Sequence, residues 1–492
     1  MPTLTDLHDS RVPAPVAVVG LLVIAAAVGF GFAAGSLGWY VILAIGALTI
    51  VAAVFYQPLF GIVLLVATIP IENMLVFSGL GTGRAIGMAV FGAWFVRKIV
   101  YRESWRNVVT GGFFPISIGF LVWVLLSLLW AEHPTVVKSG FVRLSQMVVL
   151  ALIIIDLADS RAKLDLIAKT LVLATLAAAS VTLYQSQILG VRRAGNDVAG
   201  GINETAVLLV TVLPLGFYVL RSGGSVLWRI AGALFLPVIA VSVLATLSRM
   251  NMILLPVVAL LLFLITFRER SARGWLVVLA VASVVGATLF TPWDKVRERA
   301  ATIDTYLQGT INLEDEQTDT SPRGYHLLVG LQIARDHPLR GVGYGNYGYY
   351  FRDVYQFQIP GATKLYTSPR NPHSAYIGIL ADLGAVGLSL WVGLLGVAVI
   401  GVVRAWRLGR RLPGRQLVPL AETVGLMLAL HVFAYGFYTS HQVEKLLWVI
   451  MAMSVVLGRL AAREAVESET QRPGFGPSKF DTGYARPELT VL

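Results

Sequence analysis

The sequence contains no cysteine, few histidines and few charged residues. Among its 492 residues there are seven histidines, and Asp, Glu, Lys and Arg together make up 14%. The absence of cysteine excludes disulfide bonds, thiol catalysis and cysteine-ligated metals. No histidines stand at the close spacing of a zinc site. Soluble proteins carry roughly 25% charged residues, so the composition excludes an ordinary soluble domain.

Long apolar stretches account for most of the chain. Hydrophobic residues make up 56% of it, and runs of the roughly 20 residues that cross a bilayer recur from end to end. The sequence therefore predicts an all-α, polytopic transmembrane bundle of about 12–14 spans. Pro70 and Glu72 interrupt the third span, and the break before Arg249 is short. The predicted spans cover residues 14–34, 38–55, 58–77, 84–101, 113–131, 136–157, 163–187, 203–221, 226–246, 249–267, 274–291, 374–402, 417–439 and 443–460.

The net charge of +11 indicates membrane orientation rather than nucleic-acid binding. Most basic residues stand in short segments between apolar spans, as the positive-inside rule describes. Basic groups follow the fourth, tenth and twelfth predicted spans, which places all three on the cytoplasmic side. Both termini are then cytoplasmic, and the long segment before residue 374 lies outside, on the periplasmic or extracellular face. The first span lacks the flanks of a signal peptide, so we expect it to remain in the protein.

Four regions follow from this pattern. Residues 1–291 form a transmembrane helical region, and residues 292–373 form a long, partly helical loop on the outer face. Residues 374–460 form the C-terminal transmembrane helices, and residues 461–492 form a disordered cytoplasmic tail rich in charge, proline and glycine. A loop of about 80 residues far exceeds the usual connection. Long loops on rigid scaffolds tend to carry function.

Four arginines stand on the predicted outer face, where the positive-inside rule does not place them. Arg192 and Arg193 lie between the seventh and eighth spans, Arg249 lies at a membrane boundary, and Arg323 opens the last part of the long loop. Arginines within membranes usually face a cavity or a partner, and guanidinium groups bind phosphate oxygens in pairs. The pattern indicates a pocket for a phosphorylated, lipid-embedded ligand. Arginines whose side chains extend to the membrane surface remain the alternative.

One histidine stands at the junction of the long loop and the next apolar span. His373 has an unperturbed pKa of about 6.5, so it can accept a proton from a sugar hydroxyl near neutral pH. A histidine that caps the helix is the alternative, and His326 and His337 are rivals in the same loop. His431, inside a predicted span, indicates hydrogen-bonded packing.

Other polar groups have plainer interpretations. Asp382 and Glu422 lie at membrane level, where each can pair with a buried arginine. The acidic run 314–319 could bind a divalent ion, but it is typical of a solvated loop. The sequence Gly341-x-Gly343-x-Gly345 lacks the strand and spacing of a dinucleotide site, and it predicts a turn. The first outer loop, near residues 35–38, has no acid, so neither a metal nor another cofactor is predicted.

Four stretches between residues 190 and 390 share one order with a known family. They are Arg193-Ala194-Gly195 with Ile202-Asn203-Glu204-Thr205-Ala206 and Leu213-Pro214-Leu215; Thr246-Leu247-Ser248-Arg249; Arg323 followed by Arg335-Asp336-His337-Pro338-Leu339-Arg340-Gly341-Val342-Gly343; and Pro372-His373-Ser374-Ala375-Tyr376 with Asp382-Leu383-Gly384 and Gly387. Together they resemble the O-antigen ligase and O-antigen polymerase superfamily of bacterial integral membrane glycan transferases. Departures are Ser374 for the usual asparagine, Asp382 for glutamate and Ile202 for proline.

The resemblance implies a metal-independent, inverting glycan transfer on the outer face of the bacterial cytoplasmic membrane. The donor it implies is a glycan on undecaprenyl diphosphate, and the acceptor is a hydroxyl of a glycan or lipid. By the same resemblance, Arg193, Arg249 and Arg323 would hold the diphosphate, and His373 would be the general base. Secondary candidates are Arg192, Asn203, His337 and Arg340. Membrane lipids are the other expected partners.

Three functions remain open at this point. A ligase moves a finished glycan, such as the O-antigen of lipopolysaccharide, onto an acceptor. A polymerase joins repeat units into an O-antigen or exopolysaccharide, and it shares the fold and donor with a ligase. A non-enzymatic transporter would need a polar path through broken helices near the middle of the membrane.

Overall fold

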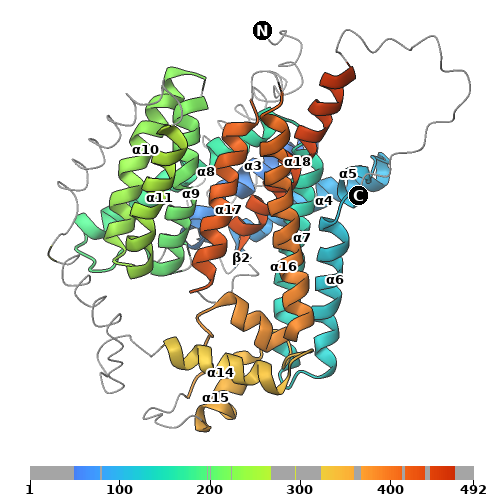
Figure 1. The fold of residues 1–492 in the computed structure, drawn as a ribbon, viewed down its shortest axis with the longest axis vertical. Coiled ribbons are helices and arrows are strands. Elements are labelled where there is room, and N and C mark those ends of the chain that lie inside the picture. Colours follow the sequence, from blue (N-terminus) through green and yellow to red (C-terminus); the bar gives the residue numbers. More distant parts are fainter. Residues whose placement is uncertain are drawn as a thin grey trace, which may run out of the picture. The chain divides into compact units, whose positions relative to one another are not determined.

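The computed structural model describes residues 49–77, 80–196, 198–199, 201–222, 224–267, 294, 323–358, 367–412, 416–437 and 444–470 (Figure 1). The chain divides into two compact units, Met1–Leu64 with Arg84–Glu103, and Leu65–Gly83 with Ser104–Leu492. The predicted spans 14–34 and 274–291, most of span 38–55, and the acidic run 314–319 lie outside the described residues. The second unit holds every described candidate site residue.

The first unit is built from helical segments. A helix over residues 49–56 precedes α3 (Pro58–Thr68), and α4 (Thr82–Val100) supplies the other described helix. Gly61 lets the helices approach closely, because a Cβ there would lie 2.5 Å from a methyl group of Val90. An ion pair of 2.6 Å between Arg97 and Glu103 follows the end of α4.

The second unit is a bundle of apolar helices with a helical extension at one end (Figure 1). It begins with a 3-10 helix, η1, and a hairpin of two-residue antiparallel strands, β1 and β2. Pro70 and Glu72 lie in η1, so the predicted interruption is confirmed. The elements are η1 (Ile69–Leu75), β1 (Val76–Phe77), β2 (Leu80–Gly81), α5 (Arg106–Val109), α6 (Phe113–Leu126), η2 (Ser127–Leu129), α7 (Pro134–Leu157), α8 (Arg161–Gln187), α9 (Ile202–Ser222), α10 (Val226–Ala245), α11 (Arg249–Phe267), α14 (Arg323–Asp336), α15 (Tyr347–Asp353), η4 (Tyr355–Phe357), α16 (Ala375–Gly409), α17 (Val418–Tyr435) and α18 (Lys445–Thr470).

The helices confirm an all-α membrane fold. Within the described residues, seven helices are long and apolar enough to cross a membrane: α7, α8, α9, α10, α16, α17 and α18. Pro58–Met74, Phe113–Leu129 and Arg249–Ile265 are shorter apolar helices. Helix α18 continues to Thr470, supported by an i,i+4 ion pair of 3.0 Å between Arg463 and Glu467. The predicted tail boundary at residue 461 is therefore wrong, since residues 461–470 are helical.

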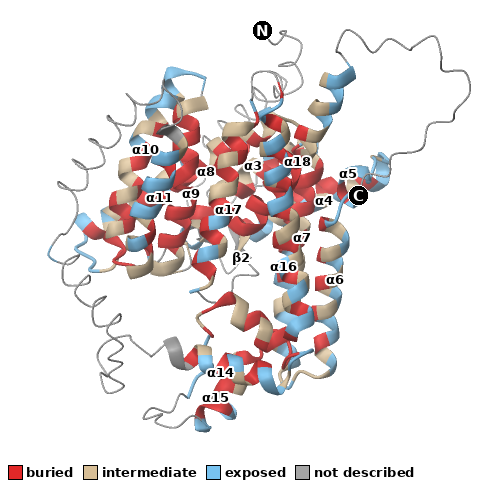
Figure 2. Cartoon of the chain, in the orientation of Figure 1, coloured by how far each residue is buried: buried red, intermediate tan, exposed pale blue. Residues whose placement is uncertain are grey.

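Two helices form the centre of the bundle. Helices α9 and α18 are buried along most of their length, whereas apolar side chains of α6, α10 and α16 are exposed on the outside (Figure 2). Helices α16 and α18 approach closely at Gly401 and Gly458, where a Cβ on Gly458 would lie 2.8 Å from the Gly401 Cα. Small residues at such crossings are typical of helix packing in membranes.

Helix α16 is broken at Gly384, and the loop signature docks into the break. Gly384 has φ +67° and ψ −169°, so the regular hydrogen-bond ladder is interrupted there. The backbone N–H of Ala385 donates to Pro338 at 2.8 Å, and the N–H of Gly343 donates to the Asp382 carbonyl at 2.7 Å. The polar groups freed by the break therefore bond to the loop.

The side chain of Asp382 joins the loop to the same place. Its carboxylate accepts the backbone N–H of Gly345 at 2.8 Å and that of Tyr347, the first residue of α15, at 2.7 Å. A carboxylate at a helix N-terminus is stabilised by the helix dipole. The alternative in which Asp382 pairs with a buried arginine is wrong, because its oxygens accept these backbone N–H groups and none of the ion pairs in the described part of the chain includes it.

The turn between α6 and α7 contacts the other side of this segment. Ser127 accepts the N–H of Tyr344 at 3.2 Å, and Asn346 accepts the N–H of His133 at 2.9 Å. The glycines at positions 341, 343 and 345 have φ of +64°, +101° and +76°, conformations that favour glycine. The turn predicted for them is confirmed, and it holds α14 and α15 at the end of the bundle (Figure 1).

We predict that Gly384→Val destabilises the protein by at least about 1–2 kcal/mol, the cost of left-handed backbone in other residues. A Cβ at Gly384 would also lie 2.2 Å from the backbone of Leu339. Thermal unfolding in detergent measures the effect. Gly396→Ala is the matched control, because Gly396 lies in the same helix and a Cβ added there would meet no atom within 4 Å. Equal unfolding temperatures for the two variants would contradict this docking.

Candidate functional site

Three sequence motifs meet where α8, α9, α10 and α11 end or begin. The N–H of Ala194, next to Arg193, donates to the carbonyl of Ala245 at 3.3 Å. The hydroxyl of Ser248, next to Arg249, donates to the amide oxygen of Asn203 at 3.2 Å. The predicted candidates Arg193, Asn203 and Arg249 thus belong to one neighbourhood, and we name these three residues the arginine cluster.

Local hydrogen bonds fix the loop that carries Arg193. Thr205 in α9 donates its hydroxyl to the carbonyl of Gly195 at 2.7 Å and accepts the N–H of Ala199 at 3.1 Å. Gln185, at the end of α8, accepts the N–H of Gly195 at 2.8 Å. Arg193 itself is half-buried, and the adjacent Arg192 is exposed. The loop is therefore a defined structure, with one arginine directed to solvent and one packed against the protein.

A strained turn places Arg249. Leu247 has φ +51°, an unusual conformation for a leucine, and it is buried between α10 and α11. The N–H of Ser248 donates to the hydroxyl of Thr246 at 3.2 Å and supports the turn. Arg249 is then the first residue of α11, half-buried at a helix N-terminus. Backbone strain of this kind is often found at functional sites.

Two histidines pack together at the other part of the site. His326 in α14 is fully buried, with its ring stacked 4.7 Å from that of Phe351 in α15. The ring of His373 packs edge-on against it, with 5.2 Å between the ring centroids. We name His326 and His373 the histidine pair. Arg323 begins α14 one turn before His326, but its side chain lies outside the described part of the chain.

His373 is not the cap of α16. Ser374 is the N-cap, and its hydroxyl accepts the N–H of Ile377 at 3.5 Å. His373 precedes the cap with φ +53° and is half-buried. The capping alternative is therefore wrong, and Ser374 serves the role for which asparagine is also well suited.

The surroundings distinguish the three loop histidines. Burial lowers the pKa of His326 to about 3, and the neighbouring His373 and Arg370 lower it further. His326 is therefore neutral at pH 7 and a poor proton acceptor. His337 lies past the other end of α14, beside Tyr350 at 6.1 Å between ring centroids. His337 follows His326 by eleven positions, a separation of about 16 Å along a helix. Of the three loop histidines, His373 is therefore the one that is partly exposed and lies within the histidine pair.

Arg340 belongs to the docked turn. Its guanidinium lies over the ring of Trp130, 5.9 Å from the centroid, and its side chain is otherwise exposed. This cation–π contact with the turn between α6 and α7 adds to the contacts that hold the loop signature. The structure thus gives Arg340 a role in docking, apart from the arginine cluster and the histidine pair.

Tyr435, at the end of α17, relates the two groups of candidates. It interacts electrostatically with Glu204, the neighbour of Asn203, and with Tyr376, three residues after His373. Tyr376 donates its hydroxyl to the carbonyl of Val432 in α17 at 2.7 Å. The arginine cluster and the histidine pair therefore lie at the same end of the bundle. Sequence reasoning missed Tyr435, because a tyrosine ending an apolar span carries no distinctive pattern.

His431 has the packing role predicted for it. It is fully buried, with its Nδ1 atom 3.3 Å from the hydroxyl of Thr211 and its ring edge-on to Tyr435. Among the residues that the structure describes, no group of three or more His, Asp or Glu side chains could hold a metal ion.

A family comparison bears on this arrangement. Residues 232–392 match the family model described as O-antigen ligase. This part of the chain is therefore similar to the O-antigen ligase superfamily. The matched region includes Arg249, Arg323 and His373, whereas Arg193 and Asn203 precede it. No curated protein matches the chain.

The match and the apolar helices together support a general function. They indicate an integral membrane protein with a glycan-processing function of the ligase and polymerase class. The O-antigen ligase region begins in α10 and ends in α16, so it contains the strained turn, the docked loop and the break at Gly384. These are the features that position the candidate residues.

We predict that stability falls as the pH is lowered below about 6.5. Above that pH, His326 is neutral in both folded and unfolded chains. Below it, the unfolded histidine gains a proton, while the folded one, with a pKa of about 3, does not. Protonation of this residue in the unfolded chain lowers the free energy of unfolding by about 2 kcal/mol at pH 5, and this loss stops growing below about pH 3.

Thermal unfolding of the detergent-solubilised protein between pH 8 and pH 4 tests this. His326→Gln should have a lower unfolding temperature than the unsubstituted protein at pH 8. Its unfolding temperature should fall less between pH 8 and pH 5. His337→Gln, which changes a half-exposed histidine, should keep the full drop. An unchanged drop in His326→Gln would contradict the buried neutral state.

Proposed function

We propose that the protein transfers a glycan from undecaprenyl diphosphate to an acceptor hydroxyl on the outer face of the bacterial cytoplasmic membrane. The reaction is metal-independent and inverts the anomeric carbon. The observation that supports it best is the presence of the arginine cluster and a partly exposed histidine at one end of an apolar bundle. The O-antigen ligase match over residues 232–392 is consistent with that reaction class.

Two steps occur together in the proposed reaction. His373 removes the proton from the acceptor hydroxyl as its oxygen attacks the anomeric carbon of the donor. The bond between that carbon and the diphosphate oxygen breaks, and undecaprenyl diphosphate leaves with the electron pair. Because attack comes from the face opposite the leaving group, the configuration at carbon is inverted.

Arginines stabilise the leaving group in this scheme. Arg193 and Arg249 are half-buried, so their charges are less screened by water than those of exposed side chains. Arg323, one turn from His326, is the third proposed diphosphate ligand. Fixed cations near a group that gains negative charge lower the barrier by several kcal/mol. Asn203 orients this region through Ser248.

The direction of α16 supports the proposed orientation. It begins beside His373, and near its other end or just after it stand Arg404, Arg407, Arg410 and Arg411. By the positive-inside rule that basic end is cytoplasmic, which puts His373, α14 and α15 outside. The division into regions at residues 291, 373 and 460, with both termini inside, is part of this proposal, apart from the helical extension to Thr470.

The polymerase alternative uses the same chemistry with another acceptor. A ligase-deficient strain accumulates lipid-linked polymer, and a polymerase-deficient strain accumulates single lipid-linked repeats. The length of the glycan that accumulates therefore separates the two. The transporter alternative has less support, because His431 has packing partners and Glu422 accepts a hydrogen bond of 3.3 Å from Trp406.

We predict that His373→Asn reduces the rate of glycan transfer by about 10²–10⁴-fold, the usual contribution of a general base. Asparagine tolerates the positive φ of this position, so the backbone is kept while the proton acceptor is removed. Transfer is measured in membranes with radiolabelled lipid-linked donor, at matched protein levels. His337→Asn is the control and should retain transfer. Full transfer by His373→Asn would refute the assignment.

We also predict that Arg249→Gln lowers transfer by about 10²–10³-fold, as the loss of one fixed donor to a developing charge does. Arg249→Lys should recover part of the activity, because lysine keeps the positive charge but cannot make the bidentate hydrogen bonds of a guanidinium group. Arg335→Gln, at an exposed arginine in the last turn of α14, controls for lost charge. If the Arg249 and Arg335 variants were equally active, the diphosphate site would have to be elsewhere.

A further inference from the structure

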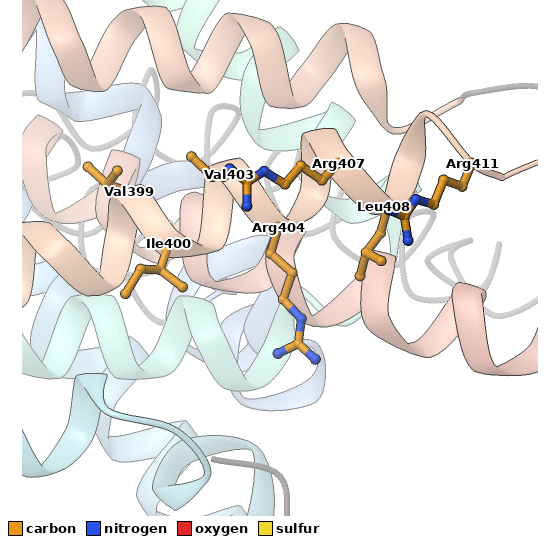
Figure 3. A pocket seen from close by; sticks show the side chains of 7 residues that line it. All are labelled: Val399, Ile400, Val403, Arg404, Arg407, Leu408 and Arg411. Atoms are coloured by element: carbon orange, nitrogen blue, oxygen red, sulfur yellow. The ribbon is translucent and has the colours of Figure 1, made fainter.

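A groove lies along α16 at the end opposite His373. Its volume is about 570 Å³, and four apolar and three basic side chains line it: Val399, Ile400, Val403, Arg404, Arg407, Leu408 and Arg411 (Figure 3). The apolar residues precede the arginines along most of the helix, so the groove changes from apolar to basic. This amphipathic gradient has no place in the proposed transfer reaction.

Three of the groove's side chains are basic and lie at the end of α16. Arg404 and Arg407 stand at i and i+3, positions that share a helix face, and Arg411 lies in the turn just after the helix ends at Gly409. Arg410 lies on a different side, with its guanidinium 4.8 Å from the centre of the Trp406 ring. All three groove arginines are exposed, and three positive charges therefore stand together at one end of an apolar helix.

No acid neutralises these charges within the part of the chain that the structure describes. The ion pairs found there join other residues, and none involves Arg404, Arg407 or Arg411. Glu422 on the neighbouring α17 accepts a hydrogen bond from Trp406. Three neighbouring guanidinium groups repel one another, so an anion placed among them is favoured.

The apolar half of the groove indicates what kind of anion fits. Val399, Ile400 and Val403 have exposed fractions of 48%, 66% and 37%, and a soluble phosphate would leave them uncovered. The stretch from Ala385 to Val403 contains no charged residue. It is about 28 Å long as a helix, close to the roughly 30 Å of a bilayer's hydrocarbon core. Arg404 is therefore at headgroup level when the break at Gly384 is at the other surface.

We propose that this groove binds an anionic glycerophospholipid. The acyl chains lie against Val399, Ile400 and Val403, and the headgroup phosphate accepts hydrogen bonds from the groove arginines. Basic pockets at membrane surfaces hold anionic lipid headgroups by the same combination of charge and apolar contact. The site is separate from the proposed transfer site and does not depend on that function.

The test is lipid binding by the full chain in detergent, followed by native mass spectrometry. The probes are dioleoyl phosphatidylglycerol, which is anionic, and dioleoyl phosphatidylcholine, which is zwitterionic. The purified protein should retain phosphatidylglycerol at least about tenfold more tightly than phosphatidylcholine. The variant R404Q/R407Q/R411Q should lose this preference, since each basic residue near an anionic surface contributes attraction. Equal retention of both lipids by the unsubstituted protein would overturn the proposal.

Matched variants separate the groove from a general effect of charge. R229Q/R335Q/R463Q removes three exposed arginines outside the groove and should keep the preference. R404K/R407K/R411K keeps the charge and should retain most of it. Unfolding temperature checks that each variant is folded. An equal loss of preference in both glutamine variants would overturn the site, as would glycerol 3-phosphate displacing the lipid at equimolar concentration.

Discussion

The carboxylate of Asp382 is the contact on which the arrangement of the site depends. It lies inside a long apolar helix, beside a glycine where that helix breaks, and accepts backbone N–H groups from Gly345 and Tyr347. A buried carboxylate without such donors is costly, and so is a buried N–H without an acceptor. Each therefore requires the other. The polar loop can lie against an apolar bundle because the break in α16 supplies matching hydrogen-bonding groups.

The positions of the candidate residues follow from this contact and from the turn before α11. The docked loop sets α14, and α14 carries His326 against His373. The turn at Leu247 sets Arg249, and Ser248 connects it to Asn203. Distant parts of the sequence thus bring the proposed base and the proposed phosphate ligands to one end of the bundle. In the proposed reaction the protein contributes fixed charge and position, while the bond to the diphosphate supplies the leaving group.

Much of the fold can be predicted from apolar runs because their ends are set by local residues. The predicted span 249–267 has the bounds of α11, and spans 163–187 and 203–221 differ from α8 and α9 by one or two residues. The break at Gly384 could not be predicted, since Asp382-Leu383-Gly384 stands in an otherwise uninterrupted apolar run. Its conformation is decided by a loop some forty residues earlier in the chain.

The candidate site is predictable in part. Arg193, Asn203 and Arg249 can be named from motifs, and the structure brings their segments together. The motifs also point to His373, but the burial and ring contacts that distinguish it from His326 and His337 come from the structure alone. The role of Arg340 also depends on Trp130, a residue about 200 positions away. Long-range packing decides such questions, and short motifs do not encode it.

The uncharged stretch of α16 has a further consequence for the membrane in which the protein works. One continuous helix joins the break at Gly384 to Arg404. The height of His373 above the lipid tails therefore depends on how that helix is tilted in the membrane. A helix answers a mismatch in hydrophobic thickness by tilting, not by stretching. Lipids of different chain length would then change the tilt of α16. The distance between the His373 imidazole and the membrane surface, where the proposed lipid-linked donor lies, would change with it.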